Sequence, residues 1–276
     1  MWSFLMGLVL SACQTTSSAP EGFVRIEGGQ YKLGAKQHHL NSQHRVEIPE
    51  FYISTYEVTN REFNEFVEAT GYVTLAEKRK DAKVFYPGLG EFRWVDDSTA
   101  NWRYPNGISR GGIEDKMDHP VTAISFLDAE AYCEWAGVRL PTLDEWEVAA
   151  GREKNSMFFW QDGKVEHIEE YANIWTGEDH LSADSRDAFP YTSPIGSFAA
   201  NPQGLYDVYG NVFEFCADRP GRLEDEENVA CARGGSWWCS VNACSYFNSL
   251  DIGRVKVWAT FSNQGFRIVR EVEETP

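Results

Sequence analysis

The sequence predicts a single α+β domain in which short strands and a few helices are joined by long irregular segments. Its 276 residues and 42% hydrophobic content are enough to bury a full core. Aromatic residues make up 14% of the chain and include ten Trp, which indicates loops pinned by large side chains. Runs with a period of two come first, and helices that begin with capping boxes follow.

The first predicted elements are strands followed by a helix. Residues 23–54 show short alternating runs that are broken by Gly28-Gly29 and by a polar stretch at 36–43, which is typical of strands and turns. Thr59 and Glu62 form a capping box that begins a helix, and Gly71 is placed to end it. We interpret this as a core helix without chemistry.

An irregular segment and two further helices come next. Residues 72–118 contain Gly, Pro and aromatic residues without a sustained period, so we expect a long surface segment. Capping boxes at Ser125 and at Thr142 each begin a helix. Cys133 lies on the first of these two helices among apolar neighbours, which predicts a buried, unpaired thiol.

The charge balance limits the partners of the chain. There are 25 basic and 42 acidic residues, and the resulting net charge of -17 repels nucleic acid and anionic membrane surfaces. We therefore expect no nucleic-acid partner. The same acidity is compatible with bound cations.

The first 22 residues resemble an export signal and a tether. The apolar run at 2–10 is too short to span a bilayer and leads into Leu10-Ser11-Ala12-Cys13, the pattern of a bacterial lipoprotein signal. We expect cleavage of residues 1–12, lipidation of Cys13 and a flexible tether over 13–22. No Lys or Arg precedes Arg25, which departs from such signals, and a plain secretory signal is the alternative. Both kinds of signal predict an exported protein. With the lipoprotein signal, a lipid alone anchors the protein to a bacterial membrane, facing the periplasm or the cell exterior.

Four cysteines in the last quarter of the chain are candidates for chemistry. Cys239 and Cys244 follow Gly234-Gly235, a glycine pair that lets the backbone come close to whatever the thiols bind. Two sulfurs without harder ligands suit Cu(I) or a disulfide. Cys216 and Cys231 flank an acidic loop, and under oxidising conditions we predict a disulfide between them.

The segment Arg233-Gly-Gly-Ser-Trp-Trp-Cys239, followed by Cys244, resembles the active-site segment of the formylglycine-generating enzymes, the sulfatase-modifying factor family. Further blocks resemble this family in the same order, among them EVTN at 57–60, HPV at 119–121 and GFR at 265–267. The resemblance covers 23–270 and leaves 271–276 as a tail. It implies one C-type-lectin-like α+β domain with low regular secondary structure.

The resemblance also implies two calcium sites. Hard cations take a mixture of carboxylate, amide and main-chain oxygens. The positions that match the first site are Asn173, Ile174, Asp187 and Phe189, and those that match the second are Asp207, Gly210, Val212 and Glu214. The alternative is that these are ordinary turn and cap residues.

The chemistry implied by the resemblance is copper-dependent oxidation of a cysteine thiol by O2 to formylglycine or a related product. Cys239 and Cys244 are the copper ligands that it implies, and Ser236 would help to position the substrate or oxygen. The expected substrate is a cysteine-containing exported protein or peptide, and the expected oligomeric state is a monomer.

Two alternatives remain open at this point. Catalytic members continue after the second cysteine with Tyr-Arg-Tyr-Arg, whereas this chain has Ser-Tyr-Phe-Asn at 245–248 and lacks the charge-assisted hydrogen bonds of those arginines. We therefore expect weak or absent activity on the standard Cys-x-Pro-x-Arg sulfatase peptide, with copper binding intact. One alternative is a non-catalytic lectin-like binding lipoprotein with a Cys239–Cys244 disulfide, and the other is an oxidase of a non-protein exported substrate such as a siderophore precursor.

Overall fold

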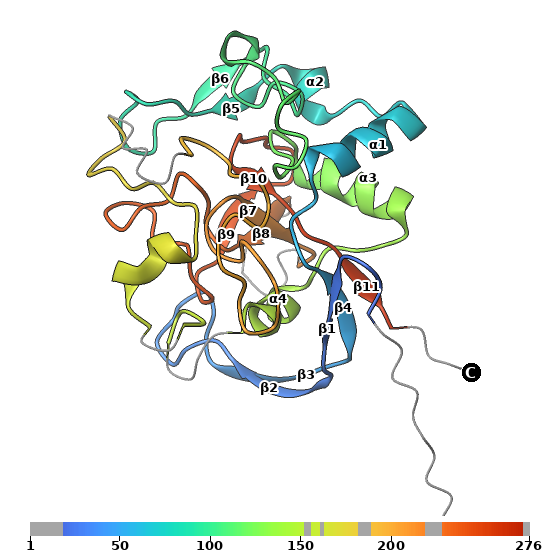
Figure 1. Cartoon of the computed structure of the whole chain (residues 1–276), viewed down its shortest axis with the longest axis vertical. Coiled ribbons are helices and arrows are strands. Elements are labelled where there is room, and N and C mark those ends of the chain that lie inside the picture. Colours follow the sequence, from blue (N-terminus) through green and yellow to red (C-terminus); the bar gives the residue numbers. More distant parts are fainter. Residues whose placement is uncertain (1–18, 152–155, 161–162, 182–188, 219–227, 273–276) are drawn as a thin grey trace, which may run out of the picture.

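The computed structural model describes residues 19–151, 156–160, 163–181, 189–218 and 228–272 (Figure 1). The predicted signal segment, Cys13 and Asp187 lie outside these residues and stay predictions. Within them the predicted α+β domain with little regular structure is confirmed, because short helices surround several small sheets.

The strands form small, separate sheets. The four-stranded sheet, in the order β10-β7-β8-β9, lies at the centre of the molecule (Figure 1). Its strands are β7 (Phe213–Cys216), β8 (Val229–Arg233), β9 (Gly253–Lys256) and β10 (Gln264–Gly265), antiparallel except for β10 with β7. A second, antiparallel sheet pairs β4 (Phe51–Ser54) with β1 (Phe23–Ile26) and with β11 (Val269–Glu271), so the last strand reaches one residue past the predicted domain boundary.

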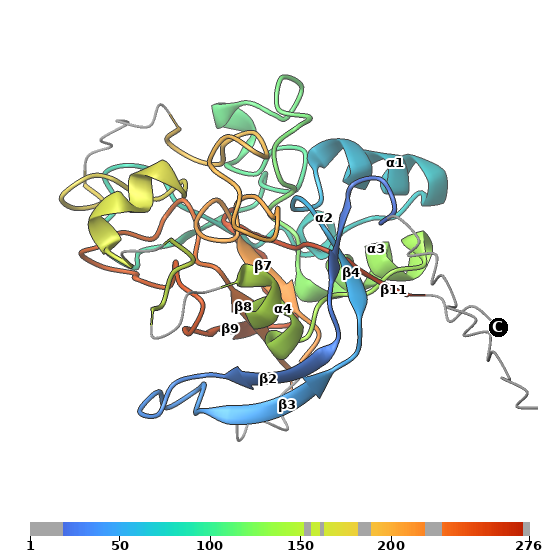
Figure 2. The same ribbon diagram turned by 60° about the horizontal axis from the view of Figure 1, so that its bottom comes forward.

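Two two-stranded ladders complete the sheets. Strands β2 (Gly29–Leu33) and β3 (His44–Ile48) form a long antiparallel hairpin that extends along one edge of the molecule (Figure 2). Strands β5 (Ala82–Val84) and β6 (Val95–Asp97) pair within the segment predicted to be irregular.

All four α-helices of the described chain begin at a capping box. They are α1 (Asn60–Thr70), α2 (Leu75–Arg79), α3 (Phe126–Ala136) and α4 (Leu143–Ala150), and the short 3-10 helices are η1 (Ile108–Arg110) and η2 (Val165–Glu170). The boxes at Thr59, Ser125 and Thr142 confirm the sequence prediction. Helix α2 was not predicted, although Thr74 and Glu77 form the same box at its start.

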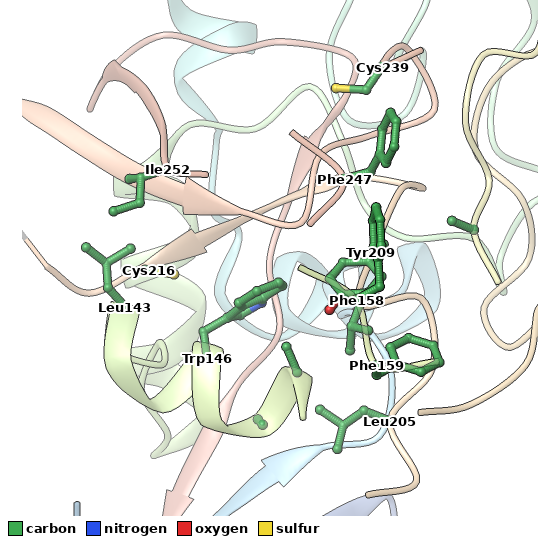
Figure 3. Packing of buried hydrophobic residues seen from close by; sticks show 14 of the residues in the cluster. Leu143, Trp146, Phe158, Phe159, Leu205, Tyr209, Cys216, Cys239, Phe247 and Ile252 are labelled. Carbon is green, nitrogen blue, oxygen red and sulfur yellow. The ribbon is translucent and has the colours of Figure 1, made fainter. Parts of the chain in front are cut away.

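The core is aromatic, and it lies on both sides of the central sheet. One cluster gathers around Trp146 of α4 and includes Tyr209, Phe158 and Cys239 (Figure 3). A second fills the space between α1 and α3, where Trp102 packs edge-on against Phe63. Large rings therefore do the packing that long helices or wide sheets do in other folds.

A buried ion pair connects elements that are distant in sequence. Arg267 donates to both carboxylate oxygens of Glu214 at 2.6 Å, and the indole Nε1 of Trp146 donates to the same carboxylate at 2.5 Å. Arg267 also donates to the carbonyl oxygens of Ser54 at 3.2 Å and Tyr206 at 2.9 Å. The pair thus holds together α4, β7, the end of β4 and the C-terminal segment. None of the helices in the described chain is both long and apolar enough to cross a membrane.

We expect Glu214→Gln to lower the free energy of unfolding by about 3–5 kcal/mol, because it leaves the Arg267 charge buried without its partner. Urea denaturation monitored by circular dichroism measures this change. Asp118→Asn is the matched control, since its partner Arg61 is exposed and such pairs contribute about 0–1 kcal/mol. Equal losses in the two variants would show that the buried pair does not hold the fold together.

Candidate active site

The candidate site lies on the loop that follows β8, and two glycines allow this loop to turn. Gly234 and Gly235 have φ angles of 85° and 73°, which L side chains rarely adopt. A Cβ on Gly234 would come within 2.8 Å of the carbonyl oxygen of Val208, and one on Gly235 within 2.7 Å of the backbone nitrogen of Phe247. The close approach that the sequence predicted is therefore between the loop and its own neighbouring backbone.

Cys239 and Cys244 are brought together by this loop. They are joined as a disulfide with their Cα atoms 4.4 Å apart. Cys239 is fully buried and Cys244 is 6% exposed. The backbone nitrogen of Trp175 donates to the carbonyl oxygen of Cys239 at 2.8 Å, which fixes the loop from outside. The structure holds the oxidised state of the pair, and two-electron reduction yields two neighbouring thiols.

Ser236 lies beside this pair, as the sequence prediction requires. Its Oγ is 4.0 Å from the Cys239 Sγ and accepts a hydrogen bond at 2.9 Å from the side-chain amide of Asn263. Both Ser236 and Asn263 are buried. A second segment of the chain, just before β10, therefore orients the hydroxyl.

The positions at which catalytic relatives carry arginines serve other purposes here. At the first of these positions Tyr246 is 36% exposed and packs edge-on against Phe213. At the second Asn248 is buried, and its side-chain nitrogen donates to Asp251 at 2.7 Å. The segment after Cys244 is therefore anchored by its own turn and presents no cation.

A cavity of about 220 Å³ adjoins Cys244. Its wall includes Phe92, Trp94, Trp238 and Phe261, and Arg254 of β9 lies among its lining residues. Phe92, Phe261 and Arg254 were not predicted from the sequence, because they come from segments that only the fold brings together.

His180 is a further residue of the site that the sequence did not reveal. It is fully buried and stacks between Trp175 and Trp238, with ring centroids 4.7 and 4.4 Å away. Its Nε2 donates to the carbonyl oxygen of Trp238 at 2.7 Å, and its Nδ1 lies 2.7 Å from the carboxylate of Glu91. The His180 ring therefore holds Trp238, the residue before Cys239, and Glu91, which lies 89 residues before His180 in the chain, holds the His180 ring.

The predicted disulfide between Cys216 and Cys231 is absent, and both residues are free thiols. They lie opposite one another on β7 and β8, and both are buried in the core. Burial raises the pKa of Cys231 to about 11 and that of Cys216 well above its ordinary value, which disfavours the thiolate from which a disulfide forms. Cys133 is buried and free, as predicted.

The residues predicted for the first calcium site are described only in part. Asn173 is fully buried, and its Oδ1 has no hydrogen-bond partner among the described residues. Its side-chain nitrogen donates to the carbonyl oxygen of Tyr191 at 2.8 Å, which leaves the amide oxygen for another contact. Ile174 follows it in the chain and Phe189 lies at the edge of the described range, while Asp187 falls outside it.

The residues predicted for the second calcium site surround an excess of buried negative charge. Asp207 and Glu57 each have one carboxylate oxygen without a partner in the described chain. Burial raises the pKa of Asp207 to about 6 and the pKa of Glu57 well above its ordinary value. The negative charge of Asp207 raises the pKa of Glu57 further. With Glu214, three buried carboxylates face the one guanidinium of Arg267. The orphaned oxygens fit a hard cation, although the oxygens of Glu214 already accept from Arg267 and Trp146.

Gly210 and Val212 can contribute only carbonyl oxygens to such a site, as expected. Gly210 has a φ of 75°, and a Cβ there would lie 2.2 Å from the carbonyl oxygen of Asn173. The two predicted calcium segments therefore touch at this glycine. Across the described ranges, no group of three or more His, Cys, Asp or Glu side chains is arranged to hold a metal ion by itself, so main-chain and amide oxygens would have to complete either site.

The chain is similar in sequence to a known protein family and to several of its members. The family described as "Sulfatase-modifying factor enzyme 1-like domain" matches residues 10–272. The formylglycine-generating enzyme of Bos taurus is 34% identical over 91% of this chain and 75% of its own length. The formylglycine-generating enzyme of Thermomonospora curvata is 36% identical over 82% of this chain and 86% of its own.

Two further comparisons bear on activity and fold. The inactive C-alpha-formylglycine-generating enzyme 2 of Bos taurus is 32% identical over 84% of this chain and 85% of its own length. Among solved structures, PvdO from Pseudomonas aeruginosa superposes with a TM-score of 0.67 at 24% identity, over 91% of this chain and 94% of that one. At this identity the second comparison shows a shared fold alone.

We expect calcium to raise the melting temperature by about 5–10 °C at 100 times its Kd, since a ligand that binds only the native state adds about 2.7 kcal/mol there. Asp207→Asn keeps the side-chain shape and suits the positive φ of 55° at this position. This variant should lose the calcium response. With chelator it should be no less stable than the unsubstituted protein at neutral pH, because it removes an unfavourable buried charge.

Differential scanning calorimetry with calcium and with chelator measures both effects. Asp118→Asn removes an exposed carboxylate and should keep the full response. A melting curve of the unsubstituted protein that calcium does not move would mean that these oxygens belong to ordinary turns.

Proposed function

Since the chain belongs to the family of the sulfatase-modifying factor enzyme 1-like domain, we propose that it is a formylglycine-generating-type oxidase. Its reaction is the copper-dependent oxidation, by O2, of a cysteine thiol in an exported protein or peptide. The observation that carries this proposal is the juxtaposition of Cys239 and Cys244 on a buried, anchored loop beside a cavity. The exported location rests on the N-terminal sequence pattern.

The donor set of the reduced pair fits Cu(I). Two thiolates are soft ligands, and the glycine turn and the Trp175 contact hold them on one short loop. Cys244 lines the cavity, so a substrate thiol that enters there meets the pair directly. Copper bound by these sulfurs would supply the one-electron chemistry that lets O2 react with a thiol.

The residues of this chain bind and orient the reactants. Cys239 is shielded from water by the core, whereas Cys244 adjoins the cavity. Ser236, held by Asn263, offers a hydroxyl next to the Cys239 sulfur for a hydrogen bond to substrate or oxygen. A preorganised donor of this kind needs no rearrangement when the reaction occurs.

The overall reaction balances with an external thiol as the second reductant. The substrate carbon next to sulfur loses two electrons and becomes an aldehyde, and its sulfur leaves as hydrogen sulfide. O2 accepts these two electrons and two more, with two protons, from the external thiol, which becomes a disulfide. One oxygen atom is accounted for by the aldehyde and the other by water. The same external thiol can reduce Cys239–Cys244 before the first turnover.

A specific observation supports a second candidate, a non-catalytic binding protein. The Cys239–Cys244 disulfide removes both soft ligands, and a relative of this chain carries the word inactive in its name. In that case the loop would be a closed structural turn. The two candidate functions differ in whether the reduced thiols of Cys239 and Cys244 take part in catalysis.

We expect the reduced, copper-loaded protein to consume O2 in the presence of a cysteine-containing peptide and to form an aldehyde. Cys239→Ser and Cys244→Ser should each lower the rate at least 100-fold, because a single sulfur does not hold Cu(I) tightly. Cys133→Ser is the matched control, a buried thiol outside the loop that should retain activity. An oxygen electrode and mass spectrometry of the peptide give the two readouts.

The contrary outcome is equally clear. If the protein with reduced thiols and added copper consumes no more O2 than the Cys239→Ser variant, with every peptide tested, the oxidase proposal fails. The binding protein then remains.

A further inference from the structure

The cavity beside Cys244 has an aromatic wall that comes from three separate segments. Trp94, from the connection between β5 and β6, packs against Trp238 of the thiol loop at 5.6 Å and against Phe261 at 5.2 Å between ring centroids. Phe92 packs edge-on against Trp238 at 5.0 Å. The volume of about 220 Å³ is below the roughly 300–1,000 Å³ of pockets for drug-sized ligands. It suits a single large side chain.

Two buried polar atoms of the cavity residues have no partner. Trp238 is 3% exposed and Gln264 is 8% exposed, and both line the cavity. The indole Nε1 of Trp238 and the side-chain Oε1 of Gln264 make no hydrogen bond among the described residues. Such orphaned groups cost about 1–3 kcal/mol each, so the wall of the cavity contains polar groups that the fold itself does not satisfy.

Arg254 gives the cavity a positive charge. It lies on β9 with its side chain exposed, and no residue of the described chain holds its guanidinium by a hydrogen bond or an ion pair. In a protein with a net charge of -17, such an available cation next to a cavity favours a carboxylate and disfavours an arginine.

The part of the cavity wall that contains Phe92 is held in place by the contacts between Glu91 and His180. Phe92 is 65% exposed and has a positive φ of 55°, yet its neighbour Glu91 is fixed by two contacts to His180, from Nδ1 at 2.7 Å and from the backbone nitrogen at 3.2 Å. The backbone nitrogen of Gly88 donates to the carbonyl oxygen of His180 at 3.2 Å. His180 is itself clamped between indoles. Glu91 and His180 are therefore positioning residues for Phe92.

We propose that this cavity is a specificity site for a peptide that carries an aromatic or large apolar residue and a carboxylate next to the target cysteine. The aromatic wall takes the side chain, and Arg254 binds the carboxylate. The inference rests on the proposed function, since it names the substrate class of the same site.

The test uses peptides that cannot react, so that binding is separated from oxidation. Each peptide carries Ser in place of the target cysteine and a neighbouring Phe, and the two versions differ only in Asp or Arg at the next position. Quenching of tryptophan fluorescence measures binding to the full-length protein. We expect the Asp peptide to bind about 10-fold more tightly than the Arg peptide, with the difference reduced at high salt.

Arg254→Glu should invert this preference, and Phe92→Ala should weaken both peptides alike. Arg45→Glu is the matched control, because it makes the same charge change at an exposed position of β3 and should leave the preference unchanged. Melting temperatures confirm that the variants fold, as expected for substitutions of exposed residues. Glu91→Gln should weaken both peptides without changing their order while its melting temperature stays that of the unsubstituted protein, which separates a positioning role from a loss of fold.

Equal binding of the two peptides, no measurable binding of either, or an Arg254→Glu variant that keeps the original order would overturn the proposal. Failure of the proposed function is separate. If the Ser peptides show the charge preference while the Cys peptides are not oxidised, the specificity site stands and the oxidase does not. If the Cys peptides are oxidised regardless of charge and the Ser peptides show no preference, the reverse holds.

Discussion

The buried pair of Glu214 and Arg267 is the interaction on which the rest of this structure depends. A fold built from small sheets and short helices has few long ladders of hydrogen bonds, so its segments need other connections. Arg267 and Glu214 join the C-terminal segment to β7, to the end of β4 and, through Trp146, to α4. Strand β7 in turn pairs with β8, which leads directly into the thiol loop. The base of the candidate site is therefore fixed by an ion pair whose charges would be costly to bury alone.

The thiol loop itself is held from several sides, and this explains how it can present a redox-active pair without losing its shape. Gly234 and Gly235 allow the close approach, Asn263 fixes Ser236, and the Trp175 backbone and the His180 ring fix the two residues at the centre of the loop. What can change on this frame is the bond between the two sulfurs. Oxidised, the pair is a closed turn; reduced, it offers two soft ligands, which is what the proposed copper site needs. The two candidate functions are thus two states of one loop.

Local signals in the sequence predicted local structure well. Contacts between distant segments could not be predicted from it, for physical reasons. Capping boxes and the glycine pair act within a few residues, so the helix starts at Thr59, Ser125 and Thr142 and the tight turn before Cys239 were predictable. The Cys216–Cys231 prediction was wrong although the two residues do face one another across β7 and β8, because spacing could not show that both are buried in the core, where they are free thiols. Arg254 and the Glu91–His180 pair become part of the site only through packing between distant segments, which no periodicity encodes.

The central claim is that Cys239 and Cys244 form a working metal site and not only a structural disulfide. An anaerobic titration of the fully reduced protein with Cu(I), combined with a count of accessible thiols before and after, tests it most directly. The account predicts one tightly bound copper ion per chain and the loss of two reactive thiols, a loss that Cys239→Ser and Cys244→Ser should abolish and Cys133→Ser should not. A reduced protein that binds no copper, or whose pair cannot be reduced without unfolding, would contradict it.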